Sequence, residues 1–344
     1  MTPDRSLRAM LGICTAILAA AAMQAGQAII APIVFALFVI GLVWPVQKAV
    51  QARLSQGLAV VVTVIVTLAV VAVLAMAVVW AFGRVAEWVI ANASRLQSLY
   101  ALKLQWLESR GIEAGSALAE QFNVRSLVRI AQGVLAQLQG LVSFAIVTAV
   151  FVILGLLEVE QAARQLAALK DSKPGAQCVL TGLAASAEKL RRYMVVRSFA
   201  SVLTGVLVYG FARWMGLDLA AEWGVIAFVL NYIPFIGPLI ATVFPTAVGL
   251  LQFGSWQAVV TIFAVLQVIQ FLIGSYLEPR LAGKQLAVSP FMVLVAVFLG
   301  AFLWGIPGAF IGVPVLIAGL TLCDQFAGTR WIAALFSGRA PEQG

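Results

Sequence analysis

The sequence predicts an all-α, polytopic membrane protein, and three observations lead to this fold class. The chain has 344 residues, of which 62% are hydrophobic and 10% are charged, and its mean hydropathy is +1.03. Several long runs carry no charged residue, which is typical of membrane-spanning helices. Two of these runs are interrupted by proline and glycine, which break helices. We therefore expect about six full transmembrane helices, two broken or re-entrant segments (eight membrane segments in all) and a helical extramembrane insert.

Residues 9–82 are predicted to form transmembrane helices one to three. The uncharged run that begins at Ala9 is too long for a single span, and the polar stretch Gln24-Ala25-Gly26-Gln27 divides it into two. A cleavable signal peptide is the alternative for the first span, although the sequence there gives only a weak cleavage site. The third span, Leu58 to Phe82, is rich in valine.

Residues 83–140 change character, because charges of both signs and aromatic residues appear. Apolar residues recur at the spacing of an amphipathic helix, so we expect a helical periplasmic arm that breaks at Gly111 and resumes at Val124. The arm is either a solvated connector or an assembly surface between subunits. Residues 141–157 are the predicted fourth span.

Residues 158–197 are predicted to form cytoplasmic amphipathic helices that are interrupted at Lys173-Pro174-Gly175. Four basic side chains in the second helix suit the anionic headgroups of the inner membrane surface. They are Lys189, Arg191, Arg192 and Arg197.

Residues 198–322 are predicted to form a transport core with two broken segments, and 323–344 a cytoplasmic tail. The first broken segment, 222–251, contains Asn231-Tyr232-Ile233-Pro234-Phe235-Ile236-Gly237-Pro238, and the second, 291–322, repeats part of its pattern. Each segment either enters and leaves on one side as a hairpin or crosses once as a kinked helix. The distribution of lysine and arginine favours two hairpins, and both arrangements place the termini in the cytoplasm.

Broken backbone at membrane depth is tolerated where protein buries it or where it lines a watery cavity, so the two breaks predict a transporter. The alternative from another class is a non-transporting membrane scaffold, which would leave the two breaks without a purpose. The candidate solute-path residues are Asn231, Pro234, Gly237, Pro238, Gln267, Gln270, Glu278, Arg280, Gly305, Pro307, Gly308, Gly312 and Pro314. Peptide groups freed at the breaks would meet a polar solute or an ion, unless neighbouring helices satisfy them.

The polar side chains among these candidates each have a second interpretation. Gln267 and Gln270 are three positions apart and share a helical face, where they either contact solute or form hydrogen bonds between helices. Glu278 either faces a water-filled cavity or pairs at the membrane interface with Arg280 or Lys284.

The composition excludes several classes of function. There is no histidine, and Cys14, Cys178 and Cys323 have no metal-type spacing, so we predict no metal site, no cofactor and no histidine-based catalysis. No phosphate-binding or nucleophile-elbow motif is present, and we do not expect an enzyme. The net charge of +8 follows membrane topology and does not indicate nucleic-acid binding. All 14 acidic residues lie outside the interiors of the predicted spans, which argues against proton antiport through a buried acid.

Several strings resemble the signature of the autoinducer-2 exporter (AI-2E) family over about residues 9–336. These are Asn231 to Pro238, Glu278-Pro279-Arg280-Leu281-Ala282-Gly283-Lys284 with Ser289-Pro290, Gly300 to Gly305, Gly308, Pro314 and Trp44-Pro45-Val46. The resemblance implies a multi-pass permease of the bacterial inner membrane that does not hydrolyse ATP and that self-associates. Members are linked to export of the signal autoinducer-2, and some to sodium/proton exchange. The expected partners are therefore membrane lipid, a small polar solute or ion, and further copies of the chain.

Overall fold

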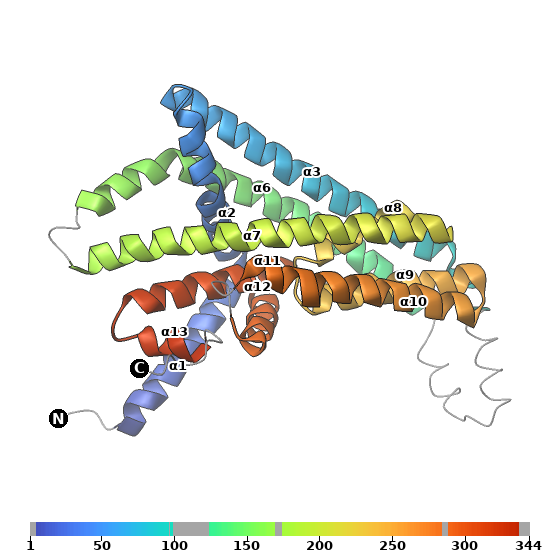
Figure 1. The fold of residues 1–344 in the computed structure, drawn as a ribbon. Helices are drawn as coiled ribbons and strands as arrows, with labels where there is room; N and C mark the ends of the chain where they lie inside the picture. The colour runs from blue at the N-terminus through green and yellow to red at the C-terminus, as the bar shows by residue number, and fades with distance from the viewer. Residues whose placement is uncertain (1–4, 96, 99–123, 169–173, 284–287, 337–344) are drawn as a thin grey trace. The chain divides into compact units, whose positions relative to one another are not determined.

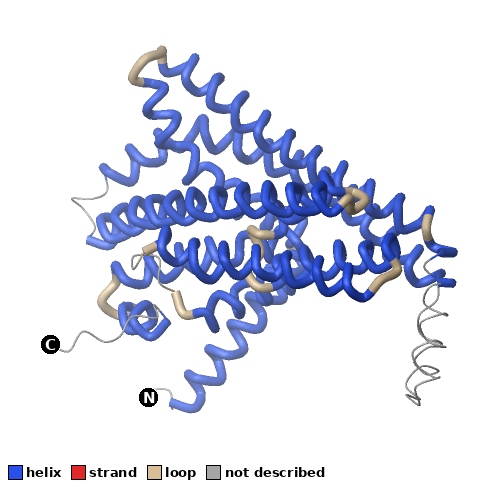
Figure 2. Tube along the Cα trace, turned by 45° about the vertical axis from the view of Figure 1, so that its right-hand side comes forward, coloured by secondary structure: helices blue, strands red, loops and turns tan. Residues whose placement is uncertain are grey.

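The computed structural model describes residues 5–95, 97–98, 124–168, 174–283 and 288–336. Every regular element in these residues is a helix, as Figures 1 and 2 show, so the predicted all-α class is confirmed. The helices are α1 (Arg5–Ala25), α2 (Gln27–Gln51), α3 (Gln56–Ala91), α6 (Val124–Ala168), α7 (Pro174–Met215), α8 (Ala220–Leu230), α9 (Ile236–Phe253), α10 (Trp256–Phe271), the π-helix η1 (Leu272–Leu277), α11 (Glu278–Ala282), α12 (Pro290–Gln325) and α13 (Arg330–Phe336).

The helices have the length and composition of a polytopic membrane protein. Seven stretches of the described residues are long and apolar enough to cross a membrane. They are Gln27–Gln51, Gln56–Ala91, Gln132–Ala168, Gln177–Met215, Ile236–Phe253, Trp256–Ala282 and Pro290–Gln325. Met10–Ala25 and α8 are apolar but shorter. Because α12 contains a sharp kink, length alone does not give the number of crossings.

The chain packs as two compact units. Unit 1 comprises residues 1–71, 144–195 and 282–344, and unit 2 comprises residues 72–143 and 196–281. The long helices α3, α6 and α7 each contribute residues to both units. Helix α7 therefore continues without interruption through residue 198, where the sequence predicted the change from a cytoplasmic helix to a membrane span.

The core of unit 2 is built around α7, α8, α9 and α10. Trp223, Ile262 and Leu266 are among its largest fully buried side chains. Glycines bring α7 and α8 into close contact, because a β-carbon at Gly224 would lie only 2.8 Å from the β-carbon of Tyr209. This close approach positions the end of α8, and the turn that follows it, against α7.

The core of unit 1 includes a cluster from α2 and α6. Ala36, Ile40, Val152 and Leu156 are buried together, with Val64 of α3 packed against them. The rings of Phe35 and Phe144 meet edge to face, with 5.5 Å between their centroids. These contacts join α2 to the half of α6 that belongs to unit 1.

The predicted division of the first apolar run is confirmed. Helix α1 ends at Ala25 and α2 begins at Gln27. Gly26 lies between them and allows close packing, since a β-carbon there would be 2.8 Å from the Cδ1 atom of Ile30. The polar stretch therefore marks a helix junction.

Other predicted boundaries agree only in part. Helix α6 covers Val124–Ala168 and α7 covers Pro174–Met215, and the residues just before each helix lie outside the described part of the chain. The expected break at Gly111 lies outside the described residues. Lys189, which the sequence assigned to lipid headgroups, instead donates a hydrogen bond to the Thr321 hydroxyl at 3.2 Å in unit 1.

The second broken segment changes direction at Trp304 and Gly305. Their backbone angles are not helical, and Gly305 has a φ of 65°. The two halves of α12 then lie against each other, because β-carbons at Gly300 and Gly308 would collide with the other half's backbone. The segment therefore folds back on itself as a helical hairpin. Pro314 lies inside the helix that follows this change of direction.

Candidate functional site

A row of polar side chains lies on one face of α7 within unit 2. We call it the polar strip: Arg197, Ser198, Ser201 and Thr204. Ser201 and Thr204 are fully buried, and Arg197 is only 6% exposed. Arg197, Ser201 and Thr204 follow at steps of four and three, and Ser198 precedes Ser201 by three, so all four lie on one side of the helix. Neighbouring positions of α7 carry exposed apolar side chains, including Phe199, Val202 and Val206.

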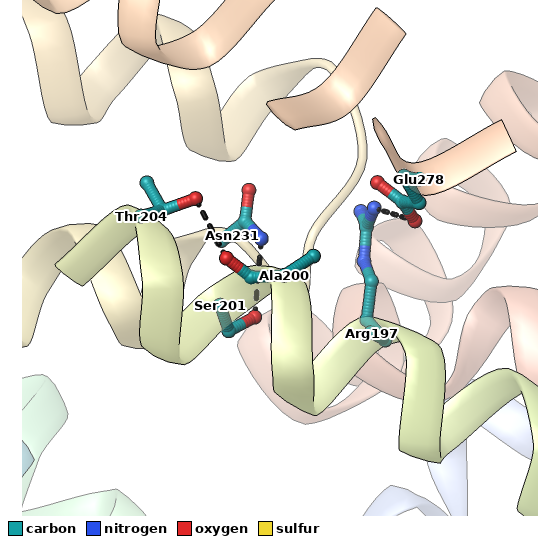
Figure 3. A network of polar contacts seen from close by, with 6 residues as sticks. All are labelled: Arg197, Ala200, Ser201, Thr204, Asn231 and Glu278. Atoms are coloured by element: carbon teal, nitrogen blue, oxygen red, sulfur yellow. Dashed lines mark hydrogen bonds and ion pairs between the residues drawn. The ribbon is translucent and has the colours of Figure 1, made fainter. Parts of the chain in front are cut away.

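The turn between α8 and α9 is hydrogen-bonded to the polar strip. Asn231, 3% exposed, donates from Nδ2 to the Ser201 hydroxyl at 3.1 Å. The adjacent Tyr232 and Ser198 hydroxyls lie 2.8 Å apart and form a second hydrogen bond. Figure 3 shows Asn231 facing Ser201 and Thr204 of α7. Asn231 therefore forms a hydrogen bond between two segments of the chain, and its amide lies at the turn of the broken segment.

The backbone of this turn is strained at one residue. Phe235 has φ 64° and ψ −53°, and the Ile236 N–H donates to the Pro234 carbonyl at 2.7 Å. This is a γ-turn with positive φ, a rare and strained conformation. Residues held in such conformations cluster at functional sites, because the surrounding structure must maintain them.

Most N–H groups of the turn are hydrogen-bonded within it, which narrows the sequence-based expectation. The N–H groups of Asn231, Tyr232, Ile233 and Gly237 all donate to local carbonyls, at 2.9 to 3.2 Å. Pro234 has no N–H to lose. The expectation was that proline and glycine would open the backbone, whereas short local turns satisfy most of its N–H groups. A solute at this turn would therefore meet mainly side chains and carbonyl oxygens.

Gly237 and Pro238 begin α9. Pro238 lies in the first helical turn, where a missing N–H costs nothing because that group has no intrahelical partner. Gly237 is required by packing, since a β-carbon there would collide with the carbonyl of Leu230. The two residues therefore fold α9 back next to the end of α8.

The π-helix η1 precedes Glu278 and changes the register of the chain. The Glu278 N–H donates to the Ile273 carbonyl, five residues earlier, as the wider π-helical turn requires. Glu278 then forms an ion pair with Arg197 of the polar strip, and its side chain is 17% exposed. Figure 3 shows the two groups facing each other. Short π-helical segments occur frequently at functional sites.

The structure corrects two predictions about charged residues. Glu278 pairs with Arg197, and Arg280 instead lies over the Tyr276 ring at 3.9 Å, while Lys284 lies outside the described residues. Arg197 is buried and does not face lipid headgroups. Glu278 and Glu222 are largely buried acids, and Glu222 lies 3.5 Å from Arg84. Sequence spacing did not reveal these pairs because their partners come from distant helices.

Two other candidates in unit 2 differ in burial although they lie on one side of α10. Gln270 is buried and Gln267 is exposed. Residues three apart lie about 60° apart around an α-helix, so the edge of the buried side can pass between them. Gln267 is therefore not supported as a contact of an internal path.

The second break forms a separate set of contacts in unit 1. The Trp304 indole N–H donates to the Met23 carbonyl at 3.2 Å, and Gln24 Nε2 lies 3.5 Å from the Phe302 carbonyl. The tip of the α12 hairpin is thus held by the junction of α1 and α2. Gly308 and Gly312 line the contact between the two halves of the hairpin. Gly305 is at the tip, and Pro307 is in the first turn of the second half.

The structure brings together Asn231, Pro234, Gly237, Pro238 and Glu278 in unit 2, whereas the candidates from Gly305 to Pro314 belong to unit 1. Sequence reasoning missed Ser198, Ser201 and Tyr232, and it gave Arg197 a different role. A signal for the strip was available, because Ser198, Ser201 and Thr204 recur every three residues through an apolar span.

Comparison with known proteins identifies the family of this chain. The family model described as AI-2E family transporter matches residues 11–328. The AI-2 transport protein TqsA of Escherichia coli K12 is 28% identical over 338 residues, which cover 95% of this chain and 94% of TqsA.

Two further relatives match over shorter regions. A presumed transport protein of Borreliella burgdorferi is 33% identical over 151 residues, covering 44% of this chain and 42% of that protein. A sodium-lithium/proton antiporter of Halobacillus andaensis is 26% identical over 118 residues, or 34% of this chain and 33% of that protein. The long match to the family model, together with the apolar helices, shows that this chain belongs to the AI-2E family of transporters and is a multi-pass membrane transport protein.

Proposed function

We propose that the protein is a secondary transporter of the bacterial inner membrane that exports a small polar solute, such as a signal of the autoinducer-2 type. The observation that carries this proposal is the polar strip of α7, which is buried against the strained turn between α8 and α9. Polar groups inside a membrane protein mark solute and ion pathways. The full-length similarity to a protein named for AI-2 transport supports this solute class.

The strip has the chemistry to hold a polar solute. Its hydroxyl groups both donate and accept hydrogen bonds, and the Asn231 amide offers both donors and an acceptor. The present contacts among these groups would be exchanged for contacts with the solute. No catalytic step is assigned to these residues, and the proposal needs no enzyme activity.

The same proposal extends to topology and assembly. The excess of lysine and arginine in the segments assigned to one side favours cytoplasmic termini, and the broken segments are proposed to enter and leave the membrane on one side. We also propose that several copies associate, with residues 83–140 as the assembly surface.

Transport by the purified full chain tests the proposal. Proteoliposomes would be loaded with autoinducer-2 and assayed for efflux with no gradient, with a sodium gradient or with a pH gradient. Efflux above that of protein-free liposomes is expected. Absence of autoinducer-2, sodium and proton flux in every arm would contradict a transporter.

A cation/proton antiporter is the second candidate. It is favoured by the largely buried carboxylate of Glu278, since ion-coupled transport needs an ionisable group in the pathway. The partial similarity to a sodium-lithium/proton antiporter agrees with it. In the same liposomes, sodium-driven proton movement without efflux of autoinducer-2 would select this function.

A further inference from the structure

The Arg197–Glu278 ion pair has a feature that an ordinary structural salt bridge lacks. Arg197 is only 6% exposed, yet in the part of the chain that the structure describes its Nε atom has no hydrogen-bond partner. Its Nη1 atom contacts Glu278. A guanidinium group normally uses its planar edge to bind two acceptors at once. One donor of this buried cation of the polar strip thus remains available.

The charges of this region cancel. Arg197 contributes one positive charge and Glu278 one negative charge, whereas Ser198, Ser201, Thr204 and Asn231 are neutral. A buried charge that loses its partner is strongly unfavourable, because few solvent or protein dipoles compensate for it. The ion pair therefore keeps the whole strip near electrical neutrality.

From this arrangement we propose that Arg197 and Glu278 together determine which solute charge the polar strip admits. The inference rests on the proposed transport function and adds the residues that set its charge selectivity. With the pair intact, a solute that carries net charge would introduce an uncompensated charge and is rejected. Without the Glu278 charge, Arg197 would be uncompensated, and the strip would become selective for anions.

A cysteine at position 201 reports this selectivity without measuring transport. In the full chain, Cys14, Cys178 and Cys323 are replaced by serine, and Ser201→Cys is introduced. The probes are three methanethiosulfonate reagents of similar size: neutral hydroxyethyl, anionic sulfonatoethyl and cationic trimethylammonium-ethyl. Each rate is divided by the reagent's rate with a small free thiol. The matched control is Val202→Cys, the next residue of α7, whose side chain is 53% exposed and does not belong to the strip.

We expect the Ser201→Cys variant to react with the neutral reagent at least about tenfold faster than with either charged reagent. Adding Glu278→Gln should shift the anionic-to-cationic rate ratio toward the anionic reagent by at least about tenfold. The double change Arg197→Gln with Glu278→Gln restores neutrality, so it should return the ratio to its starting value. This double variant also shows whether a changed ratio comes from charge or from a disturbed fold.

Glu87→Gln serves as the charge control, because it removes the same charge from an exposed side chain of α3. It should leave the rate ratio unchanged. Equal reaction of position 201 with all three reagents would overturn the proposal, as would no reaction at all or no shift with Glu278→Gln. Failure of liposome transport with selective labelling intact would instead count against the proposed function, so the two failures are distinguishable.

Discussion

At the scale of single residues, the Asn231 side chain links the broken segment to α7 through Ser201. Replacing it in Asn231→Leu removes this hydrogen bond and a polar group from the proposed path. The free energy of unfolding should fall by about 1 kcal/mol, the usual size for such bonds between membrane helices. Solute flux should fall much more than stability. Thermal unfolding in detergent and liposome efflux measure the two effects.

The control for this prediction is Thr204→Val in the same strip. The Thr204 hydroxyl donates to the Ala200 carbonyl of its own helix at 2.8 Å, so its loss should not release the turn. Equal loss of flux in both variants would show that Asn231 has no special position.

Strain at Phe235 leads to a second prediction. Glycine adopts positive φ without steric cost, and the Phe235 side chain is 54% exposed, so little packing is lost. Phe235→Gly should therefore raise the free energy of unfolding by roughly 1 kcal/mol. Leu239→Gly is the control, because Leu239 has a similar exposure but lies within α9. Glycine inside a helix should lower stability by about 1 kcal/mol. A similar drop in both variants would argue against strain.

How much of the site follows from sequence also differs between residues. The sequence indicated Asn231 because an amide next to two prolines in an apolar run is conspicuous. The Arg197–Glu278 pair could not be predicted, since its residues are far apart in the chain and meet only through the packing of α7 against the residues after η1. The π-helix has no reliable signature in composition, and it changes the direction in which Glu278 points.

At the scale of elements, glycines at close contacts determine whether the broken segments fold back. Gly237→Ala places a β-carbon on the Leu230 carbonyl, which is backbone and cannot move aside easily. We expect a loss of about 1–3 kcal/mol in the free energy of unfolding, as for other overpacked sites. Gly308→Ala should cause a similar loss of stability in the α12 hairpin, where the added β-carbon would meet the Gly300 backbone.

The control for both glycines is Gly210→Ala in α7, where nothing lies within 4 Å of an added β-carbon. This change should stabilise the helix by roughly 0.5–1 kcal/mol. The midpoint of thermal unfolding separates these cases. If Gly237→Ala and Gly308→Ala were as stable as Gly210→Ala, the close approaches would not exist in solution.

The tip of the α12 hairpin gives another prediction. Trp304→Phe keeps a ring but removes the indole N–H that donates to the Met23 carbonyl. The hydrogen-bonded N–H groups near the tip should then exchange with solvent faster, by up to about tenfold for the loss of one hydrogen bond. Hydrogen exchange measured by mass spectrometry over residues 300–310 tests this. Unchanged exchange would show that the α1–α2 junction does not hold the tip.

Element boundaries illustrate what sequence could and could not supply. The junction at Gly26 was predicted, because polar residues and a glycine mark it directly. Pro314 lies inside the second half of α12, since proline is tolerated within membrane helices when neighbours compensate. The break falls at Trp304 and Gly305 because only Gly305 takes the positive φ required there.

At the scale of the whole molecule, the chain divides in a way that no local pattern reveals. Residues 198–322 were predicted to form one transport core, and this functional division stays a prediction. By packing, residues 196–281 belong to unit 2 and residues 282–344 to unit 1. The long helices that supply residues to both units have the sequence pattern of ordinary continuous spans, so the sequence does not show where one unit ends and the other begins. Partition into units depends on contacts between distant segments, which periodicity does not encode.

The most direct test of the central claim is whether an adduct on the polar strip blocks solute flux. Proteoliposomes with Ser201→Cys in the cysteine-free chain would be labelled with the neutral hydroxyethyl reagent and assayed for autoinducer-2 efflux. We predict that labelling abolishes efflux through Ser201→Cys and leaves Val202→Cys active. Undiminished efflux after complete labelling of position 201 would contradict a solute path along this face of α7.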